Sequence, residues 1–284
     1  MYFCKKKNMS RTSHDDLIHP FLRWAGGKKW LVKRIKDTLD VSCFTSYHEP
    51  FVGGGAMLFH LRPQKAYISD ANEQLMLTYQ NVRDNVEEVI DCIISFGTGE
   101  TAYYSVRGIN TDNNIEKAAQ FIYLNQMSYN GIYRVNSLGN YNVPWGKRIN
   151  YQFDFNNLKR VSKYLKRVQI QSVDFEESVK RVRRGALVFL DPPYTHSKIE
   201  NGFIQYNQKT FKLEDQKRLS FMIDKIKSRG AYYILTNADH EVIKEIFDKN
   251  DRTIPITRSS GIGGKNARRG LYEECIFTNT NLTI

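Results

Sequence analysis

The sequence predicts an α/β fold, in which a doubly wound and mostly parallel sheet is interrupted by an insertion. Short apolar segments typical of buried strands alternate with segments of helical spacing in the first 70 and the last 130 or so residues. Residues 75–150 between them change character, and the chain contains no internal repeat or low-complexity linker. With 284 residues, the chain is long enough for one core domain that carries a substantial insertion.

Seven strands and several connecting helices make up the expected alternation. A helix is expected at 28–39, and another after the glycines at 53–55. The helix expected at 214–229 is followed by Gly230, a residue type that often ends a helix, and a further helix is expected at 239–249. The expected strands are 47–51, 65–70, 168–173, 186–190, 231–236, 252–257 and 273–278.

The insertion combines helical segments with a long irregular one. Apolar residues recur at helical spacing over 74–96 and 115–127. Residues 128–150 are rich in glycine, asparagine, aromatic residues and arginine without a regular period, which is typical of a functional loop or hairpin. The predicted organisation is a disordered basic tail at 1–15, a core domain formed by 16–74 and 151–284, and an inserted domain at 75–150.

Composition restricts the partner and the setting. The formal net charge of +12 indicates a polyanionic partner, nucleic acid first and an anionic membrane surface second, with a solvated basic surface as the alternative. No apolar run approaches the length of a membrane span, and the basic N-terminus lacks the apolar core of a secretory signal. The four cysteines are far apart in the sequence, at Cys4, Cys43, Cys92 and Cys275. This spacing predicts neither a metal site nor a disulfide framework, and it favours a reducing, cytoplasmic setting.

A glycine turn follows the first expected strand, in the run EPFVGGG at 49–55. Glycines at this place let backbone approach a ligand closely, and the next helix N-terminus favours negative groups. Asp70, at the end of the second strand, is placed to accept hydrogen bonds from ribose hydroxyls, or alternatively to cap the helix before Glu73. The turn has neither GxGxxG spacing nor a GK[ST] ending, so neither a dinucleotide fold nor a P-loop is indicated.

The run Asp191-Pro192-Pro193-Tyr194 directly follows the apolar segment 186–190. The prolines remove two N–H donors and leave carbonyls that only accept hydrogen bonds, the carboxylate adds an acceptor, and the tyrosine offers a flat stacking face. Such a set can hold an amino group by both of its N–H bonds while the attached ring stacks. The alternative is a proline-rich turn that ends a buried strand.

Adenine fits this arrangement as a substrate. Its amino nitrogen is a weak nucleophile because the lone pair is delocalised into the ring. Acceptors on both amino hydrogens favour a pyramidal nitrogen whose lone pair points at a methyl donor. The predicted catalysis is therefore electrostatic and orientational, without a covalent intermediate.

Three motifs in this order, WAGGK at 24–28, EPFVGGG and DPPY, resemble the Dam/DpnM-type family of adenine-N6 DNA methyltransferases of the alpha group. The likeness extends over roughly residues 20 to 280. It implies a Rossmann-like, seven-stranded methyltransferase sheet with a helical and β-hairpin target-recognition insert. It also implies S-adenosyl-L-methionine as cofactor, double-stranded DNA as partner and no metal. It leaves the protein partner open, and one alternative is a cognate restriction endonuclease that forms no stable complex with the enzyme.

The resemblance also implies roles for individual residues. Lys28 would lie near the methionine carboxylate of the cofactor, Asp70 would bind the ribose, and Asp174 with Phe175 would contact the adenine. The alternatives are a solvated Lys28 at a helix start and a purely structural Trp24. The implied cofactor contacts are Trp24, Lys28, Phe51, Gly53, Asp70, Asp174, Phe175 and Asp191, and the implied catalytic residues are Asp191, Pro192, Pro193 and Tyr194.

Residues 129–136 and 142–147 resemble the recognition hairpin of enzymes that modify GATC. Arg134 is suited to a guanine edge, and Ile132 and Pro144 to a thymine methyl. Tyr129 could fill the space that a flipped base leaves. Residues 258–270 suit phosphate contact, and 195–211, with Tyr206 and Phe211, would cover the target base. The expected DNA contacts are Arg23 (where relatives usually carry lysine), Tyr129, Asn130, Ile132, Arg134, Asn136, Pro144, Lys147, Lys265, Arg268 and Arg269.

Two alternatives to adenine methylation are retained and one is disfavoured. Cytosine-N4 methyltransferases share the chemistry but tend to carry serine at the position of Asp191. A catalytically silent DNA-binding subunit could keep the fold, although the intact motifs argue against it. Cytosine-C5 chemistry needs a nucleophilic cysteine, and none stands beside the two prolines.

Overall fold

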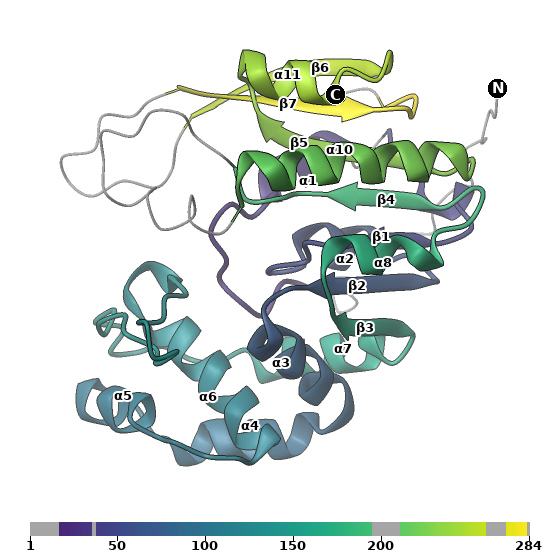
Figure 1. Ribbon diagram of the computed structural model, residues 1–284. Coiled ribbons are helices and arrows are strands. Elements are labelled where there is room, and N and C mark those ends of the chain that lie inside the picture. Colours follow the sequence, from purple (N-terminus) through teal and green to yellow (C-terminus); the bar gives the residue numbers. More distant parts are fainter. Residues whose placement is uncertain (1–16, 36–37, 195–210, 260–270, 283–284) are drawn as a thin grey trace. The chain divides into compact units, whose positions relative to one another are not determined.

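The computed structural model describes residues 17–35, 38–194, 211–259 and 271–282. Seven strands form one mixed sheet in the order β3-β2-β1-β4-β5-β7-β6 (Figure 1). The pairs β1–β4, β2–β3 and β4–β5 are parallel, and β7 runs antiparallel to β5 and to β6. The predicted seven-stranded, mostly parallel α/β sheet is confirmed. The strands are β1 Tyr47–Glu49, β2 Ala66–Asp70, β3 Val168–Ser172, β4 Leu187–Leu190, β5 Tyr232–Ala238, β6 Arg252–Ser259 and β7 Leu271–Thr278.

The helices agree with the predicted pattern in part. The helical segment expected at 74–96 is two helices, because Asn85 adopts a non-helical conformation with φ −133° between them. Three helices were not predicted, α5, α7 and the four-residue α8, although the apolar residues of α7 recur at helical spacing. The helices are α1 Lys29–Ile35, α2 Ala56–Leu61, α3 Glu73–Asp84, α4 Val86–Ser95, α5 Glu100–Arg107, α6 Asn114–Met127, α7 Phe155–Leu165, α8 Phe175–Ser178, α10 Leu213–Ser228 and α11 Glu241–Phe247, with short 3₁₀ turns η2 Val41–Cys43, η3 Tyr129–Gly131 and η4 Val179–Arg181.

The chain divides into two compact units. One comprises residues 1–43 and 52–173, and the other residues 44–51 and 174–284. In the first unit, α3 packs against α4, α6 and α7, and α6 also packs against α4 and α5. The boundaries expected for the inserted domain, 75–150, stay a prediction.

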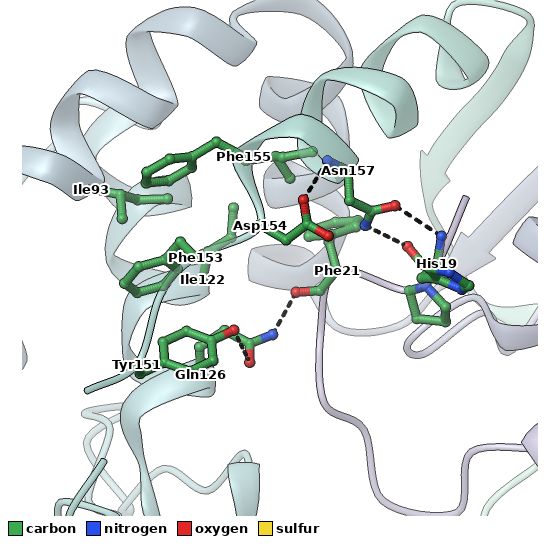
Figure 2. Close-up of a pocket in the computed structure, with 12 residues that line it drawn as sticks. His19, Phe21, Ile93, Ile122, Gln126, Tyr151, Phe153, Asp154, Phe155 and Asn157 are labelled. Carbon is green, nitrogen blue, oxygen red and sulfur yellow. Dashed lines mark hydrogen bonds between the residues drawn. The ribbon is translucent and has the colours of Figure 1, made fainter. Parts of the chain in front are cut away.

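Side-chain amides fix the extended segment 19–23 within the first unit. Asn157 accepts from the N–H of His19 and donates to its carbonyl, both at 2.9 Å, and Gln126 donates to the carbonyl of Phe21 at 2.7 Å. Figure 2 shows these side chains around a small pocket, where Tyr151 also donates its hydroxyl to Gln126. The segment that leads into the WAGGK motif is therefore fixed by hydrogen bonds to α6 and α7.

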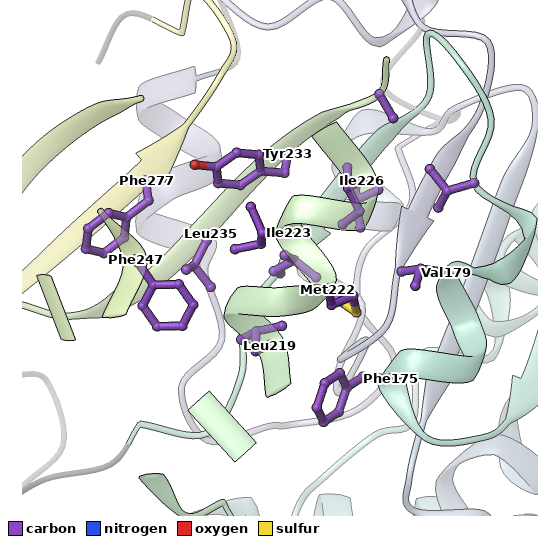
Figure 3. Packing of buried hydrophobic residues seen from close by; sticks show 14 of the residues in the cluster. Phe175, Val179, Leu219, Met222, Ile223, Ile226, Tyr233, Leu235, Phe247 and Phe277 are labelled. Carbon is purple, nitrogen blue, oxygen red and sulfur yellow. The ribbon is translucent and has the colours of Figure 1, made fainter. Parts of the chain in front are cut away.

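The second unit has its own apolar core (Figure 3). Leu219, Ile223 and Ile226 recur at helical spacing on α10 and pack with Tyr233 and Leu235 of β5. Burying one such large apolar side chain contributes roughly 1.5–3 kcal/mol. Gly230 follows α10 with φ +68°, which confirms the predicted glycine at the helix end.

The cysteines depart from one expectation. Cys43 is disulfide-bonded, whereas Cys92 and Cys275 are free. The bond at Cys43 was not foreseen from the sequence, because spacing along the chain does not determine which thiols approach each other in the fold. Within the described ranges, no helix combines the length and apolar character needed to cross a membrane, and no group of three metal-ligating side chains was found.

Candidate active site and recognition segment

The glycine turn at 53–55 is organised by Asp70. One carboxylate oxygen of Asp70 accepts a hydrogen bond from the N–H of Gly53 at 3.1 Å, and the other accepts from the N–H of Asn72 at 3.0 Å. Helix α3, which follows Asp70 in the sequence, is capped by Asn72, whose side chain accepts a hydrogen bond from the N–H of Leu75. The alternative role of Asp70 as the helix cap is therefore wrong.

Asp70 is an unusual carboxylate electrostatically. Burial raises its pKa, and hydrogen bonds from the backbone N–H groups of Asn72 and Gly53 act in the opposite direction. Each carboxylate oxygen can accept more than one hydrogen bond, so these backbone contacts do not exhaust its acceptor capacity. A desolvated carboxylate beside a glycine turn is a candidate for binding hydroxyl groups.

Trp24 packs directly against the glycine turn. A Cβ atom on Gly53, where φ is +46°, would lie 2.7 Å from Cδ1 of Trp24, so a side chain is not tolerated there. The indole also stacks near Tyr133 and Phe121, with ring centroids 5.7 and 6.4 Å away. Trp24 thus joins the glycine turn to residues 128–150 by packing contacts, and its role toward the cofactor stays a prediction.

Lys28 is a buried lysine. Lys28 is only 3% exposed, and its Nζ donates a hydrogen bond to the carbonyl of Gly26 at 3.1 Å. The alternative of a solvated lysine at a helix start is therefore wrong. A buried ammonium is suited to a negatively charged ligand group.

The second unit carries the other proposed cofactor residues. The rings of Phe51 and Phe175 lie 5.4 Å apart, and Phe211 packs on both at 5.8 and 5.7 Å. Phe211 is buried in this cluster, and its expected place beside the target base stays a prediction. Asp174 caps α8 and forms an ion pair with Arg218, whose guanidinium lies 4.7 Å from the centre of the Phe175 ring.

The DPPY motif begins immediately after β4. Asp191 accepts a hydrogen bond from the hydroxyl of Thr236 at 2.7 Å, and the hydroxyl of Tyr194 donates to Glu274 at 2.9 Å. Burial, together with the charges of Asp191 and Glu274, raises the pKa of Tyr194, so that its phenol stays protonated. Neither Thr236 nor Glu274 was predicted from the sequence. Their only signal was a polar residue inside a strand that also carries several apolar residues.

Residues 128–150, the candidate recognition segment, form a hairpin-like loop. It is closed by bridges between Ser128 and Trp145 and between Val135 and Tyr141. Asn136 organises its tip, because its side-chain oxygen accepts from the N–H groups of Leu138 and Asn140. Figure 1 shows this segment, which follows α6, within the first unit. The predicted loop or hairpin at 128–150 is confirmed.

Arg134 is held in one orientation. Its Nε donates to the side-chain oxygen of Asn142 at 2.7 Å, and Nη2 donates to the carbonyl of the same residue at 3.0 Å. Such a guanidinium is preorganised, since little further side-chain entropy is lost on binding. Tyr129 is 46% exposed, Pro144 and Lys147 are also exposed, and Asn130 adopts φ +54°.

Arg23 lies beside this loop in the first unit. Its backbone N–H donates to Asn125 at 2.8 Å, and the Asn125 amide donates to the carbonyls of Arg23 at 2.8 Å and Gly131 at 3.3 Å. Gly131 packs so closely that a Cβ there would lie 2.5 Å from Cβ of Arg23. Burial, followed by the positive charge of Arg148, lowers the pKa of Arg23.

Arg148 was not identified from the sequence. Its guanidinium lies 3.8 Å from the centre of the Tyr151 ring and donates to the carbonyl of Gln126 at 2.7 Å. With Arg23 it gives this part of the first unit two neighbouring positive charges, which favours an anionic or acceptor-rich ligand. Three of the expected phosphate contacts, Lys265, Arg268 and Arg269, lie outside the described residues, as does Tyr206.

Comparison with known proteins agrees with these features. The family described as D12 class N6 adenine-specific DNA methyltransferase matches residues 24–260. The Type II methyltransferase M1.LlaDCHI of Lactococcus lactis subsp. cremoris is 34% identical over 274 residues, covering 92% of this chain and 95% of the relative. The Type II methyltransferase M.MjaIII of Methanocaldococcus jannaschii is 36% identical, covering 92% and 99%.

A more distant relative is the DNA adenine methylase of Haemophilus influenzae, which is 28% identical and covers 81% of this chain and 82% of its own length. The family match spans the WAGGK, EPFVGGG and DPPY motifs, and the resemblance inferred from them is confirmed. The cytosine and non-enzymatic alternatives are thereby set aside. The chain belongs to the D12 class of N6 adenine-specific DNA methyltransferases, and it is an adenine-specific DNA methyltransferase.

Proposed function

We propose that the enzyme uses S-adenosyl-L-methionine to methylate N6 of an adenine flipped out of double-stranded DNA. The observation that carries this proposal is Asp191, an acceptor fixed by Thr236 at the end of β4 and followed by two prolines and a tyrosine. S-adenosyl-L-methionine, when bound, supplies an electrophilic methyl group. The residues of the chain then have to bind the cofactor, orient the base and take up charge.

Several residues that the resemblance implies for cofactor binding carry groups that suit S-adenosyl-L-methionine. In the first unit, Asp70 offers carboxylate oxygens for ribose hydroxyls, buried Lys28 offers a positive charge for the methionine carboxylate, and Gly53 lets the backbone approach. Trp24 backs the turn. In the second unit, Phe51, Phe175 and Asp174 offer apolar faces and a carboxylate acceptor for the adenine ring and its amino group.

The DPPY residues orient the target base. Asp191 accepts one amino hydrogen, and a backbone carbonyl of the Pro192-Pro193 run, where no N–H donor is present, accepts the other. With both hydrogens held, the nitrogen lone pair points at the methyl group, and the negative charge of Asp191 stabilises the positive charge that develops on nitrogen. Tyr194 supplies the face on which the flipped base stacks, a contact worth roughly 1–3 kcal/mol.

Residues 75–150 serve in this proposal as the DNA target-recognition domain, and GATC as the target site. Arg134 reads a guanine edge, and Ile132 and Pro144 contact a thymine methyl. Tyr129 replaces the flipped base. The further proposed DNA contacts are Arg23, Asn130, Asn136, Lys147, Lys265, Arg268 and Arg269.

The test is methylation of an unmethylated plasmid with tritiated S-adenosyl-L-methionine, followed by mapping of modified bases by direct sequencing. We expect incorporation into adenine at GATC and none with Asp191→Ala. Label in cytosine, or incorporation that survives Asp191→Ala, would overturn the chemistry. Adenines modified equally well outside GATC would end the proposal on specificity and leave the chemistry standing.

A further inference from the structure

A buried carboxylate lies next to the DPPY motif. Glu274 on β7 is only 2% exposed, and one of its oxygens accepts the hydroxyl hydrogen of Tyr194 at 2.9 Å. Withdrawing a carboxylate from water is costly unless hydrogen-bond donors satisfy it. A costly group in contact with a motif residue is a candidate for a functional role.

Strand register explains how Glu274 reaches Tyr194. In the antiparallel pair β5–β7, Thr236 lies opposite Ile276 and Ala238 lies opposite Glu274, so Thr236 and Glu274 project from the same face of the sheet. In the parallel pair β4–β5, Leu190 is in register with Leu235, which brings Asp191 alongside Thr236. Neighbouring strands therefore supply Thr236 to Asp191 and Glu274 to Tyr194, and the Thr236 hydroxyl also lies within hydrogen-bonding reach of Tyr194.

Tyr194 needs such a contact to present its ring in one direction. Pro192 and Pro193 restrict the backbone that leads to it, but they leave its side-chain torsion angles free. A hydrogen bond at the phenol oxygen fixes the far end of the ring axis. Because a phenol O–H prefers to lie in the plane of its ring, an acceptor at that end also favours one orientation of the ring face.

We propose that Glu274 is a positioning residue for methyl transfer, which holds the ring of Tyr194 in the orientation that receives the flipped adenine. This inference rests on the proposed role of Tyr194 as the stacking face. In this proposal Glu274 acts on catalysis through its hydrogen bond with the Tyr194 hydroxyl. The raised pKa of Tyr194 is consistent with this, because the phenol stays protonated, and so remains a hydrogen-bond donor, at neutral pH.

The test compares four variants in single-turnover methyl transfer at saturating cofactor. Glu274→Ala removes the acceptor, Tyr194→Phe removes the donor, and a third variant combines both. The control is Glu273→Gln, which changes the exposed neighbouring carboxylate on the same strand. Fluorescence of 2-aminopurine at the target position reports whether the base is still flipped and stacked.

We expect Glu274→Ala and Tyr194→Phe each to slow methyl transfer about tenfold, the effect of one lost hydrogen bond. The double variant should be no slower than the slower single variant, and 2-aminopurine should report a less ordered flipped base in all three. Glu273→Gln should behave as the unchanged enzyme. Wild-type rates in Glu274→Ala together with a slow Tyr194→Phe, or losses that multiply in the double variant, would overturn the inference.

Two further measurements keep the outcomes distinct. Tyr194→Ala with unchanged methyl transfer would refute the proposed stacking role itself, irrespective of Glu274. If Glu274→Ala does not fold, 3-fluorotyrosine at position 194 can be titrated by fluorine NMR in the Glu274→Gln background. Loss of the negative charge should lower the pKa of that phenol, and an unchanged titration would show that Glu274 does not act on Tyr194.

Discussion

The carboxylate of Asp70 and the backbone N–H of Gly53 are hydrogen-bonded at 3.1 Å, although 17 residues separate them in the sequence. The residue proposed to bind the cofactor ribose therefore also shapes the turn along which the cofactor would lie. A change of the Asp70 side chain therefore affects both the proposed ribose contact and the shape of the glycine turn. This coupling makes Asp70 the most informative residue in the first unit.

Replacing Asp70 with alanine should weaken S-adenosyl-L-methionine binding. The variant loses charge-assisted hydrogen bonds to the ribose, each worth roughly 1.5–3 kcal/mol, and relaxes the glycine turn as well. Isothermal titration calorimetry should show a dissociation constant raised by at least about tenfold. The matched control is Asp91→Ala, which removes an exposed aspartate from α4 and should leave the affinity unchanged. Equal affinities of the two variants would refute the role of Asp70.

Cofactor affinity should also depend on pH through Asp70. The ionised carboxylate is the better acceptor for ribose hydroxyls, so binding weakens as the pH falls through the pKa of Asp70. Because burial raises that pKa, the loss should begin at a higher pH than an ordinary aspartate, near 3.9, would give. Calorimetric titrations between about pH 4 and 7 should show this loss of cofactor affinity with falling pH in the wild-type enzyme and not in Asp70→Asn. Identical slopes in both proteins would contradict the assignment.

Replacing Thr236 with valine should slow methyl transfer without unfolding the protein. Valine keeps the shape of threonine but cannot donate to Asp191, whose carboxylate would then lose a 2.7 Å hydrogen bond and its fixed orientation. We expect a single-turnover rate about tenfold lower, with cofactor affinity and thermal stability nearly unchanged. Thr253→Val on β6, an exposed position, is the control. A wild-type rate in Thr236→Val would show that Asp191 is oriented by other groups.

The chemistry-bearing motifs could be found in the sequence, but the residues that orient them could not. Asp191 and Tyr194 can be recognised in the sequence because two prolines between a carboxylate and an aromatic residue form a local pattern. Thr236 and Glu274 become partners of that motif only through strand pairing across 40 or more residues, which periodicity does not specify. The strands were predicted well since apolar runs bounded by turns are local signals. The break at Asn85 between α3 and α4 was missed because nothing in its neighbours' spacing interrupts the helical pattern.

Replacing Asn142 with alanine should relax target recognition at the same base pair as Arg134→Ala. Asn142 holds the Arg134 guanidinium by one hydrogen bond to its side-chain oxygen and one to its backbone carbonyl, so Asn142→Ala removes the first and leaves the arginine present but less firmly oriented. Losing the arginine contact to guanine should cost about 1–3 kcal/mol of discrimination, and loosening it should cost less. Competitive methylation of duplexes that differ at each position of the site measures both. Relaxation at different base pairs in the two variants would show that Asn142 does not act through Arg134.

Replacing Asn125 with aspartate should affect stability and recognition together. The Asn125 side chain is fully buried, accepts from the N–H of Arg23, and donates to the carbonyls of Arg23 and Gly131. Aspartate has the same shape but cannot donate when ionised, which leaves two carbonyls without this donor and adds a buried charge.

We expect the free energy of unfolding of Asn125→Asp to fall by at least about 1–3 kcal/mol, the usual cost of buried groups left unsatisfied. Because Asn125 fixes the backbone of Arg23 against the turn that contains Gly131, discrimination at the base pair contacted by Arg23 should fall as well. Urea unfolding gives the first quantity, and competitive methylation compared with Arg23→Ala gives the second. Asn113→Asp, which keeps an acceptor at the exposed N-cap of α6, is the control and should change neither. A destabilised Asn125→Asp enzyme with wild-type discrimination at every base pair would mean that Asn125 supports the fold alone and does not position Arg23 for recognition.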